Sequence, residues 1–399
     1  MTARARSALV IGGGISGPVM ALALQKAGVD ATIYEAYEHA PEGAGGGMSI
    51  APNGLDALDV LGLGDQVRSA GVPMTGIVLQ DWAGRRLGEF GNPRCVQPMR
   101  FIMRSDLQRV LLQEVYRRGI RIEQGKRLMD IDEGSGGICA RFADGTSAWA
   151  DILIGADGIR STVRGVIDPQ APGPEYAGLI SFGARLQNAG LPSTDGKMNM
   201  SFGKRGFFGY QIFDDGSASW FVNLPRRSTM TSSEAKKTAA VDWITLLSAA
   251  FAEDRTPARD FISRTNPSDL VVVGPVENMP KVPNWSRGRM VLIGDAAHAP
   301  SSSSGQGASL AIESAIELAQ CLRDLPVECA LAAYETLRRP RVERVIAETT
   351  RTNSSKTAGP IGRVINSLVM RVVTKLVKPE KLAWMFQYPI DWDRRVTSR

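Results

Sequence analysis

The sequence has few of the residues that bind transition metals or form disulfides. It holds two histidines and four cysteines among 399 residues, and no two cysteines form a Cys-x-x-Cys pair. A structural zinc site needs about four such ligands at close spacing, so we expect no metal centre. We expect the cysteines to be reduced thiols that mostly pack inside a cytoplasmic protein.

Long hydrophobic runs are also absent. No run of about eighteen consecutive apolar residues occurs, so the sequence predicts no membrane-spanning helix. Apolar residues make up 43% of the chain and charged residues 22%, which is typical of a globular protein. The first strand-like run begins at residue 8, and we expect no cleaved signal peptide before it. A chain of this length predicts more than one domain.

Acidic residues are scarce towards the C-terminal end. Residues 334–399 hold fourteen Lys and Arg against six Asp and Glu, a balance of +8 in a chain of net charge +6. We expect an amphipathic helix there that docks on the body of the protein, with a membrane or anionic partner as the alternative. Its apolar residues recur at helical spacing: Ile361, Val364, Ile365, Leu368, Val369, Val372 and Leu376. No motif indicates nucleic-acid binding.

Glycine is abundant, and it gathers in three motifs. These are GGGISG at residues 12–17, GADGIRS at residues 155–161 and GDAAH at residues 294–298, each after a compact apolar run. A single Gly-x-Gly-x-x-Gly match is common and weak. Three motifs in this order are far more specific, and together they predict three contact regions of one flavin adenine dinucleotide.

The first motif has the context of a dinucleotide-binding turn, between the apolar run at residues 8–11 and a helical pattern. Gly12 allows the tight turn, Gly14 lets a pyrophosphate approach the backbone, and Gly17 lets the helix pack on its strand. The phosphates would then lie at the helix N-terminus. Glu35 ends the next strand, at residues 31–34, eighteen residues after Gly17; a carboxylate there suits a ribose hydroxyl and disfavours the 2′-phosphate of NADP.

The segment between the second and third motifs is rich in strand patterns. Alternating side chains separated by short glycine-containing turns predict an antiparallel meander. We expect helical sequence after it and then a strand that leads back to the flavin domain. The expected ranges are 77–81 and 86–90 for a hairpin, 197–202, 207–213 and 218–224 for the meander, 232–263 for helix and 270–273 for the last strand.

With these motifs, the chain resembles the single-component (class A) FAD-dependent aromatic hydroxylases, the monooxygenase family that includes p-hydroxybenzoate hydroxylase, salicylate hydroxylase and the tetracycline-inactivating monooxygenases. The resemblance extends to GGGMSIAPNGLDALDVLGL at residues 45–63 and MRSDLQRVLL at residues 103–112. It implies an α/β fold: a Rossmann-like FAD-binding domain of the GR2 type, interrupted by a mixed β-sheet substrate domain and followed by a C-terminal helix. The implied ranges are 1–75, 101–172 and 272–330 for the FAD-binding domain, 76–100 and 173–271 for the substrate domain, and 331–399 for the helical segment.

The motifs and the resemblance assign a set of cofactor-binding residues. Arg104 matches a family arginine that contacts the cofactor, Asp157 belongs to the Ala-Asp-Gly motif, and Asp295 matches the aspartate that accepts a hydrogen bond from the ribityl chain. Residues 305–307 match the loop whose amides approach the flavin pyrimidine, where a helix N-terminus stabilises the negative charge of a reduced flavin. The full set is Gly12, Gly14, Ile15, Ser16, Gly17, Glu35, Gly47, Met48, Arg104, Asp157, Asp295, Gly305, Gly307 and Ala308.

In this family the meander sheet covers the cavity above the flavin. We therefore expect Met200, Phe208, Tyr210 and Trp220 to line the substrate side, where they would stack on a planar substrate and exclude water. For most of these residues an ordinary sheet core is the alternative. Ser302, from the serine run at 301–304, would offer a hydroxyl to the substrate.

Three positions depart from the family pattern. Ser302 stands where the family commonly has proline, Ser309 stands where asparagine is common, and Glu313-Ser314 replaces a Glu-Asp pair. Because the proline carbonyl often lies near the reacting centre, the first departure concerns substrate activation more than flavin binding.

The resemblance implies an NAD(P)H-consuming monooxygenase that hydroxylates an aromatic or polycyclic small molecule through a flavin C4a-hydroperoxide, in natural-product or xenobiotic metabolism. FAD would be bound non-covalently, with NADPH or NADH as a transient reductant. Because the flavin supplies the oxygen chemistry, we assign no catalytic side chain and expect His298 only to order its turn. A non-oxygenating flavoprotein (a reductase or a ligand-sequestering binder) stays an alternative, as does a flavin-dependent halogenase, whose Trp-x-Trp signature is incomplete at Trp220. The oligomeric state, monomer or dimer, stays open.

Overall fold

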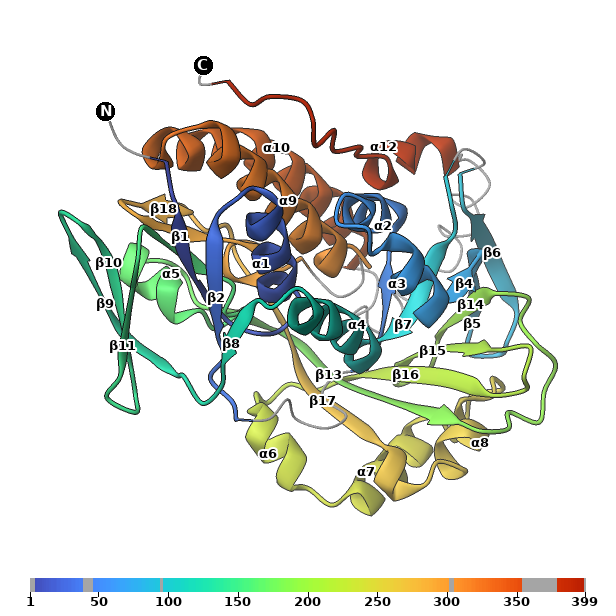
Figure 1. Cartoon of the computed structure of the whole chain (residues 1–399). Coiled ribbons are helices and arrows are strands. Elements are labelled where there is room, and N and C mark those ends of the chain that lie inside the picture. The colour runs from blue at the N-terminus through green and yellow to red at the C-terminus, as the bar shows by residue number, and fades with distance from the viewer. Residues whose placement is uncertain (1–3, 39–45, 94–95, 301–304, 354–378, 398–399) are drawn as a thin grey trace.

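The fold is α/β and is built on two large sheets. The computed structural model describes residues 4–38, 46–93, 96–300, 305–353 and 379–397. In Figure 1 a six-stranded sheet with its helices occupies the upper part of the molecule, and a seven-stranded sheet lies below it. The mixed sheets agree with the fold class that the sequence predicts.

The six-stranded sheet is built from short apolar runs. The segments Ser-Ala-Leu-Val-Ile and Ile-Leu-Ile-Gly are almost wholly buried, as strands of a parallel sheet covered on both faces require. The predicted strands at residues 8–11 and 31–34 are confirmed. In spatial order the strands are β18 (Ser286–Arg287), β19 (Met290–Leu292), β12 (Ile152–Gly155), β1 (Ser7–Ile11), β2 (Asp30–Tyr34) and β8 (Arg121–Glu123).

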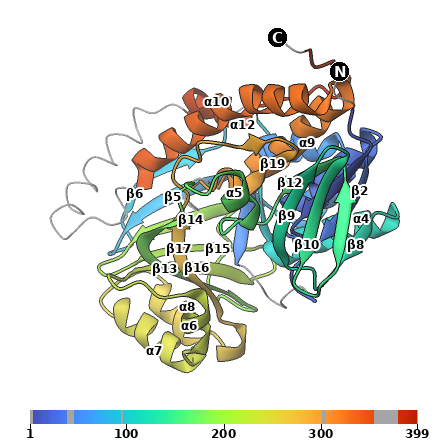
Figure 2. The ribbon, with the colours of Figure 1, turned by 90° about the vertical axis from the view of Figure 1, so that its left-hand side faces the viewer.

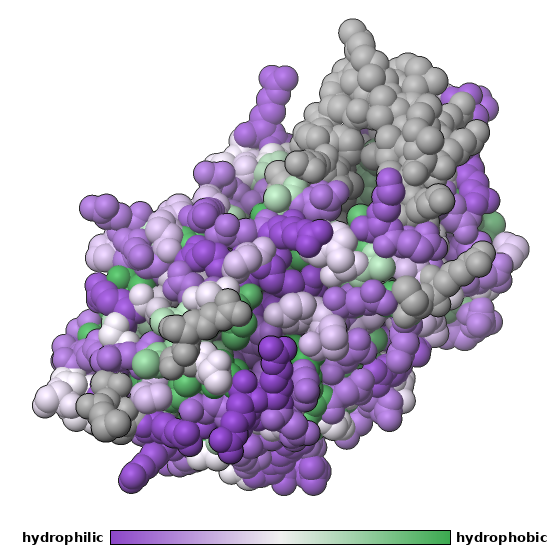
Figure 3. All heavy atoms as spheres, turned by 90° about the horizontal axis from the view of Figure 1, so that it is seen from above, coloured by the Kyte–Doolittle hydropathy of each residue, from purple (hydrophilic) through white to green (hydrophobic). Residues whose placement is uncertain are grey.

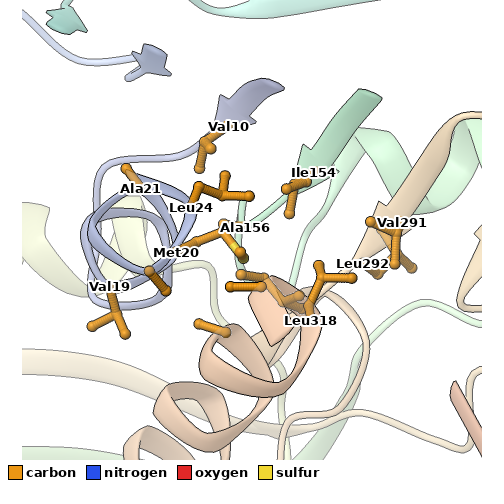
Figure 4. Packing of buried hydrophobic residues seen from close by; sticks show 14 of the residues in the cluster. Val10, Val19, Met20, Ala21, Leu24, Ile154, Ala156, Val291, Leu292 and Leu318 are labelled. Atoms are coloured by element: carbon orange, nitrogen blue, oxygen red, sulfur yellow. The ribbon is translucent and has the colours of Figure 1, made fainter. Parts of the chain in front are cut away.

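Helices cover one face of this sheet, and a small sheet covers the other. Helices α1 (Ser16–Lys26) and α9 (Gly307–Asp324) bring Met20, Leu24 and Leu318 against the strands, as Figure 4 shows. On the opposite face, the ring of Phe142 stacks on Tyr34 with centroids 4.8 Å apart. The small sheet, at the left in Figure 1, consists of β9 (Leu128–Gly134), β10 (Gly137–Phe142) and β11 (Ser147–Ala150); Figure 2 views it from its own side, with the short helix α5 (Thr162–Ile167) beside it.

The seven-stranded sheet contains the predicted meander. Strands β14, β15 and β16 pair antiparallel, β5 and β6 form the predicted hairpin, and β14 joins β5 in parallel. Strands from two distant parts of the chain thus share one sheet, and the domain boundaries stay a prediction. In spatial order the strands are β17 (Val271–Asn278), β13 (Glu175–Leu186), β16 (Ala218–Pro225), β15 (Phe207–Ile212), β14 (Lys197–Phe202), β5 (Gly76–Asp81) and β6 (Arg86–Gly91).

The helical region expected at residues 232–263 is three short helices. They cover the lower side of the seven-stranded sheet, which we call its helix-facing side (Figure 1). The helices are α6 (Ser232–Lys237), α7 (Ala240–Ala250) and α8 (Ala258–Ser263), followed by a 3-10 turn η1 (Pro267–Asp269).

A fourth sheet, of three strands, lies between the two halves of the fold. Within the segment at residues 45–63 that resembles the family, a helix begins at Pro52, the first residue of α2. The sheet and its helices consist of β3 (Gly47–Ile50), β7 (Met99–Met103) and β4 (Val72–Met74), with α2 (Pro52–Asp59), α3 (Gly64–Ala70) and α4 (Arg104–Arg117).

The C-terminal part of the described chain runs back over α9. Helix α10 (Val327–Asn353) packs on α9, and η4 (Pro379–Leu382) and α12 (Ala383–Phe386) follow. The predicted amphipathic helix at residues 361–376 lies outside the described residues. Seen from above, this face is mostly hydrophilic, with hydrophobic residues scattered in small patches (Figure 3). Among the described helices, none combines the length and the apolarity needed to cross a bilayer.

Candidate cofactor and substrate site

The three glycine motifs, far apart in sequence, meet in space. Gly12 has φ +108°, and a Cβ on it would overlap the carbonyl oxygen of Ala156 in the second motif. A Cβ on Gly294, in the third motif, would overlap Ser16 Oγ of the first. Between the second and third motifs, Arg164 Nη1 donates to the Ala296 carbonyl at 3.1 Å. The structure therefore assembles one site from three separate turns.

The turn at residues 12–17 provides no side-chain cap for the start of α1. A Cβ on Gly17 would overlap the Gly12 carbonyl, so both positions require glycine. Ile15 is the N-cap residue of α1 and provides no side-chain hydrogen bond to the helix. The first N–H groups of a helix carry partial positive charge and have no partner within the helix, which suits a diphosphate.

Glu35 stands directly beside this turn, at the end of β2. Its Oε2 accepts a hydrogen bond from the Gly13 N–H at 2.6 Å, and its Oε1 accepts one from the Tyr37 N–H at 3.0 Å. Gln108 Nε2 donates to the Gly13 carbonyl at 2.9 Å, a contact that the sequence motifs did not reveal. These bonds fix the carboxylate where its remaining lone pairs face the site.

Asp157 caps a helix with one oxygen and leaves the other open. Its Oδ2 accepts from the N–H groups of Thr162 at 2.7 Å and Val163 at 3.1 Å, at the start of α5. Its Oδ1 is buried with no hydrogen-bond partner among the described residues. Burial raises the pKa of Asp157, and the Ser161 hydroxyl and then the backbone N–H donors lower it in part. An unpaired buried acceptor is costly, so this atom suits a ligand hydroxyl or N–H.

Arg104 and Asp295 both lie near the first turn, close enough to interact electrostatically. Arg104 is exposed at the start of α4, and its Nη2 would lie 3.8 Å from a Cβ on Gly14. Asp295, in the turn η2 (Gly294–Ala296), also has an exposed surface, although protein atoms surround it at longer range. This surrounding protein raises the pKa of Asp295 by desolvation, and the charge of Arg104 lowers it in part. A cation and an acceptor therefore stand beside the first turn.

The second helix N-terminus of the site is that of α9. Gly305 has φ +60°, and a Cβ on it would lie 2.7 Å from Ser49 Oγ. Gly307 and Ala308 are the first two residues of α9, and Gln306 is its N-cap. Gly47 and Met48 lie on the adjacent strand β3; a side chain on Gly47 would overlap the ring of Phe101.

Asn53 holds this N-terminus in place, and sequence reasoning missed it. Its Nδ2 donates to Gln306 Oε1 at 3.0 Å and to Glu313 Oε1 at 2.5 Å, and all three side chains are fully buried. Glu313 in turn pairs with Arg338 at 2.8 Å and with Arg341 at 3.0 Å, both on α10. Buried charges need such partners because desolvation is costly.

Arg341 extends this network to α12, near the C-terminal end of the described residues. Its Nη1 donates to the Trp384 carbonyl and its Nη2 to the Met385 carbonyl, each at 2.9 Å. The packing of α2 on α9 explains Ser309. Its Oγ accepts a hydrogen bond from the Ala51 N–H at 3.0 Å, and a Cβ on Gly54 would come within 2.7 Å of this oxygen. The close approach of α2 favours a small residue there. Ser302 lies outside the described residues.

His298 is a packing residue in this geometry. Its Nε2 lies 3.1 Å from Ser314 Oγ, and its ring packs 5.5 Å from that of Trp285. Burial lowers the pKa of His298 to about 3, so the ring is neutral at neutral pH. Ser314, the second residue of the Glu313-Ser314 pair, thus holds His298 of the third glycine motif in place.

The prediction that Met200, Phe208, Tyr210 and Trp220 line one cavity is wrong. Side chains alternate between the two sides of a sheet, and residues paired across strands share a side. Met200 pairs with Gly209, so Phe208 and Tyr210 point to the opposite, helix-facing side, and Trp220 pairs with Tyr210.

These three rings belong to a separate aromatic core. Phe208 packs 6.0 Å from Phe251 and 6.3 Å from Phe261, and Tyr210 packs 5.7 Å from Phe261. Trp220 Nε1 donates to Thr265 Oγ1 at 3.1 Å. A surface cavity of about 340 Å³ beside Tyr210 is on this same side, since Val78 and Ile212 also line it. It is therefore separated from the glycine motifs by the sheet.

The other side of the seven-stranded sheet faces the glycine motifs, and we call it the flavin-facing side. It bears a group of residues that we call the methionine cluster: Met74, Met99, Met198 and Ala51, which are buried, and Ile77, Phe101, Met200, Phe221 and Phe386, which are partly buried. Met99 Cε would lie 3.5 Å from a Cβ on Gly305, so the cluster adjoins the start of α9. Sequence reasoning identified only Met200 of this group as a site residue.

The described residues fit a bound FAD. Two helix N-termini without side-chain caps, the carboxylates of Glu35, Asp157 and Asp295, and the guanidinium of Arg104 are supplied by turns that pack closely at their glycines. They offer no metal site, because no cluster of three or more His, Cys, Asp or Glu suited to an ion occurs among the residues described.

Comparisons with known proteins agree with this geometry. Residues 6–349 match the family model of the FAD binding domain. Aurachin C monooxygenase/isomerase from Stigmatella aurantiaca is 30% identical over 378 residues, 93% of each chain. The 3-amino-4-hydroxybenzoate 2-monooxygenase PtmB3 of Streptomyces platensis is 33% identical over 354 residues, 84% of this chain and 85% of that protein. Klebsiella pneumoniae HpxO, solved with FAD and uric acid, shares the fold with a TM-score of 0.85 at 24% identity, over 95% of this chain and 96% of that one.

Proposed function

The chain belongs to the FAD binding domain family and is an FAD-dependent monooxygenase, and from this premise we propose that it hydroxylates an aromatic or polycyclic small molecule at the expense of NAD(P)H. The observation that carries the proposal is the meeting of the three glycine motifs beside the methionine cluster. Relatives that cover most of the chain are named as a monooxygenase/isomerase of aurachin C, a hydroxylase of urate and a monooxygenase of an aminohydroxybenzoate.

Each residue of the site has a distinct task in binding the cofactor. The turn at residues 12–17 and the start of α1 bind the pyrophosphate, and Glu35 accepts from the ribose. Asp295 accepts from the ribityl chain, and Arg104 lies beside the first turn as a counter-charge. The N-terminus of α9, held by Asn53, faces the pyrimidine edge and stabilises negative charge there.

When bound, FAD supplies the redox and oxygen chemistry, and the protein orients the reactants and excludes water. The reaction balances as substrate, dioxygen, NAD(P)H and a proton giving the hydroxylated product, NAD(P)⁺ and water. The methionine cluster forms an apolar wall next to the start of α9, which keeps water from the reacting centre. No described side chain is needed as acid, base or nucleophile.

The reductant and the location in the cell belong to the proposal as well. We place the enzyme in the cytoplasm, where NADPH or NADH visits the flavin transiently. Whether it acts as a monomer or a dimer is left to measurement of its mass in solution.

The test begins with the purified protein, which should be yellow. Heating should release a chromophore whose mass is that of FAD; FMN or no flavin would contradict the proposal. A screen of aromatic compounds for stimulated NAD(P)H oxidation, repeated with isotopically labelled dioxygen, should find a product that carries the label. NAD(P)H oxidation without label in any product would instead indicate a reductase, and ligand binding without oxidation would indicate a sequestering protein.

A further inference from the structure

One row of side chains crosses the flavin-facing side of the seven-stranded sheet and changes from apolar to polar. Ile77 pairs with Met198, and Ser219 pairs with both Gln211 and Arg185. One step beyond the Asn199–Tyr210 pair, the register brings Met198 level with Gln211. The row therefore runs from β5 to β13 with Gln211 in its middle.

The neighbouring row of residues on the same side of the sheet contains two glycines, so it projects less from the sheet. Met200 pairs with Gly209, which pairs with Phe221, and Phe221 pairs with Gly183. A Cβ on Gly209 would overlap the Phe221 ring, so that ring lies over the glycine. The row next to that of Gln211 is therefore apolar, and its aromatic ring suits stacking with a planar molecule.

Gln211 itself has an unused acceptor. The side chain is fully buried, and its Nε2 donates to the Pro73 carbonyl in β4 at 3.3 Å, beside Met74 of the methionine cluster. Its Oε1 has no partner among the described residues. The hydrogen bond through Nε2 fixes the amide, so Oε1 is presented as an acceptor and not as a donor.

The methionine cluster consists of apolar side chains, which offer no counter-charge of their own. The cation in the row, Arg185, is already engaged: it donates to Ser217 Oγ at 3.2 Å, lies 3.8 Å from Asp215 and stacks on Phe213. A substrate carboxylate against the cluster would lose its hydration without gaining a counter-charge. Methionines adapt their shape, so the wall accepts rings of varied outline.

We propose that the substrate is an uncharged, mainly apolar ring compound that lies on the methionine cluster and donates one N–H or O–H hydrogen bond to Gln211 Oε1. This inference rests on the proposed function and deepens it by naming the class of substrate. Gln211 thereby becomes the residue that selects for a donor group on the ring.

The test uses three probes that share one ring system: 2-naphthol, 2-methoxynaphthalene and 6-hydroxy-2-naphthoate. Their dissociation constants are measured on the FAD-bound protein by equilibrium dialysis at neutral pH, and by the shift of the flavin absorbance. We expect 2-naphthol to bind about tenfold tighter than 2-methoxynaphthalene, because the ether leaves Oε1 unpaired. The naphthoate should bind more weakly than 2-naphthol by at least about tenfold.

The decisive variant is Gln211→Met, which keeps the length of the side chain and removes the acceptor. Its preference for 2-naphthol over the methyl ether should fall to within about twofold. Tyr210→Phe is the matched control, since it is the next residue of β15 but points to the helix-facing side. It should keep the wild-type preference.

The comparison of probes on the wild-type protein needs no variant, so it decides even where Gln211→Met fails to fold. Tightest binding of the naphthoate, lost in Arg185→Gln, would overturn the inference and leave the proposed function standing. An unchanged preference in folded Gln211→Met, or failure of all three probes to bind, would also overturn it. A protein that contains no FAD would contradict the proposed function, whereas the dialysis would still report on Gln211.

Discussion

The two sides of the seven-stranded sheet use the same strands for different purposes. On the helix-facing side, Phe208, Tyr210 and Trp220 interlock with the rings of α7 and α8 and their flanking residues, and all are nearly inaccessible to solvent. On the flavin-facing side, Met200 and Phe221 alternate with glycines and stay partly exposed. Interlocked, buried rings therefore characterise the helix-facing side, whereas methionines, glycines and partly exposed rings characterise the side that we propose meets a ligand.

Packing physics accounts for the contrast. Rigid rings fill a core at high density and resist change, whereas methionine side chains fit several shapes. Substitutions on the two sides should accordingly separate stability from activity.

The largest effect is expected on the helix-facing side. Phe208→Ala should lower the free energy of unfolding by about 3–5 kcal/mol, because it opens a cavity in a fully buried aromatic core. Urea unfolding followed by tryptophan fluorescence measures this loss. The FAD content of the folded fraction should stay unchanged. A variant that keeps its stability but loses FAD would place Phe208 at the cofactor and break the comparison.

The next effect belongs to the flavin site. Asp295→Ala should weaken FAD binding by about tenfold to a hundredfold, the range for a hydrogen bond to a charged acceptor. Asp295→Asn keeps an acceptor and should lose less. Titration of the apoprotein with FAD, followed by flavin fluorescence, gives both constants. Equal FAD affinities in the two variants and the wild type would show that Asp295 does not bind the ribityl chain.

On the flavin-facing side, Met200→Ala should uncouple the enzyme with little loss of stability. The side chain is partly exposed, so the free energy of unfolding should fall by no more than about 2 kcal/mol. Water that enters beside the flavin should raise the peroxide formed per NAD(P)H consumed. Tyr210→Ala is the counterpart, expected to lose stability and keep its coupling. The reverse pattern would show that the two sides have been assigned wrongly.

The smallest effect is the contribution of His298, in the flavin half, to the pH dependence of stability. Burial holds the pKa of His298 at about 3, whereas the unfolded chain protonates near 6.5. Below that value the unfolded state binds a proton that the folded state does not, so stability falls by about 1 kcal/mol between pH 6.5 and about 5.5. FAD release should precede loss of near-ultraviolet circular dichroism on acidification, and His298→Gln should flatten the slope. A slope that persists in the variant would have another origin.

Local signals account for what the sequence predicted well. Glycines with positive φ, such as Gly12, and wholly apolar strands, such as β1, can be predicted from the local sequence without knowledge of their neighbours in space. The side of the sheet on which Tyr210 lies depends on how β14 pairs with β15, and a shift of one residue reverses it. Alternation within each strand was correctly predicted, but the pairing between strands was not available from the pattern.

The contacts that hold the start of α9 were invisible for a different reason. Asn53 and Glu313 are 260 residues apart, and although both lie in segments that resemble the family, nothing in either segment indicates that the two side chains meet. Gln211 was not predicted as a site residue, because a glutamine in a strand pattern looks like any other polar residue. Only the structure shows its neighbours and its unpaired side-chain oxygen.

The Asn53–Glu313 network also dictates an order of assembly during synthesis. The turn at residues 12–17 leaves the ribosome first, but Glu313 finds its counter-charges only when Arg338 and Arg341 have emerged. Arg341 in turn reaches the carbonyls of Trp384 and Met385, which are translated later still. For most of translation the nascent chain therefore lacks the partners that complete this network, and the start of α9 gains its full support only when residues 384 and 385 have folded back on α10.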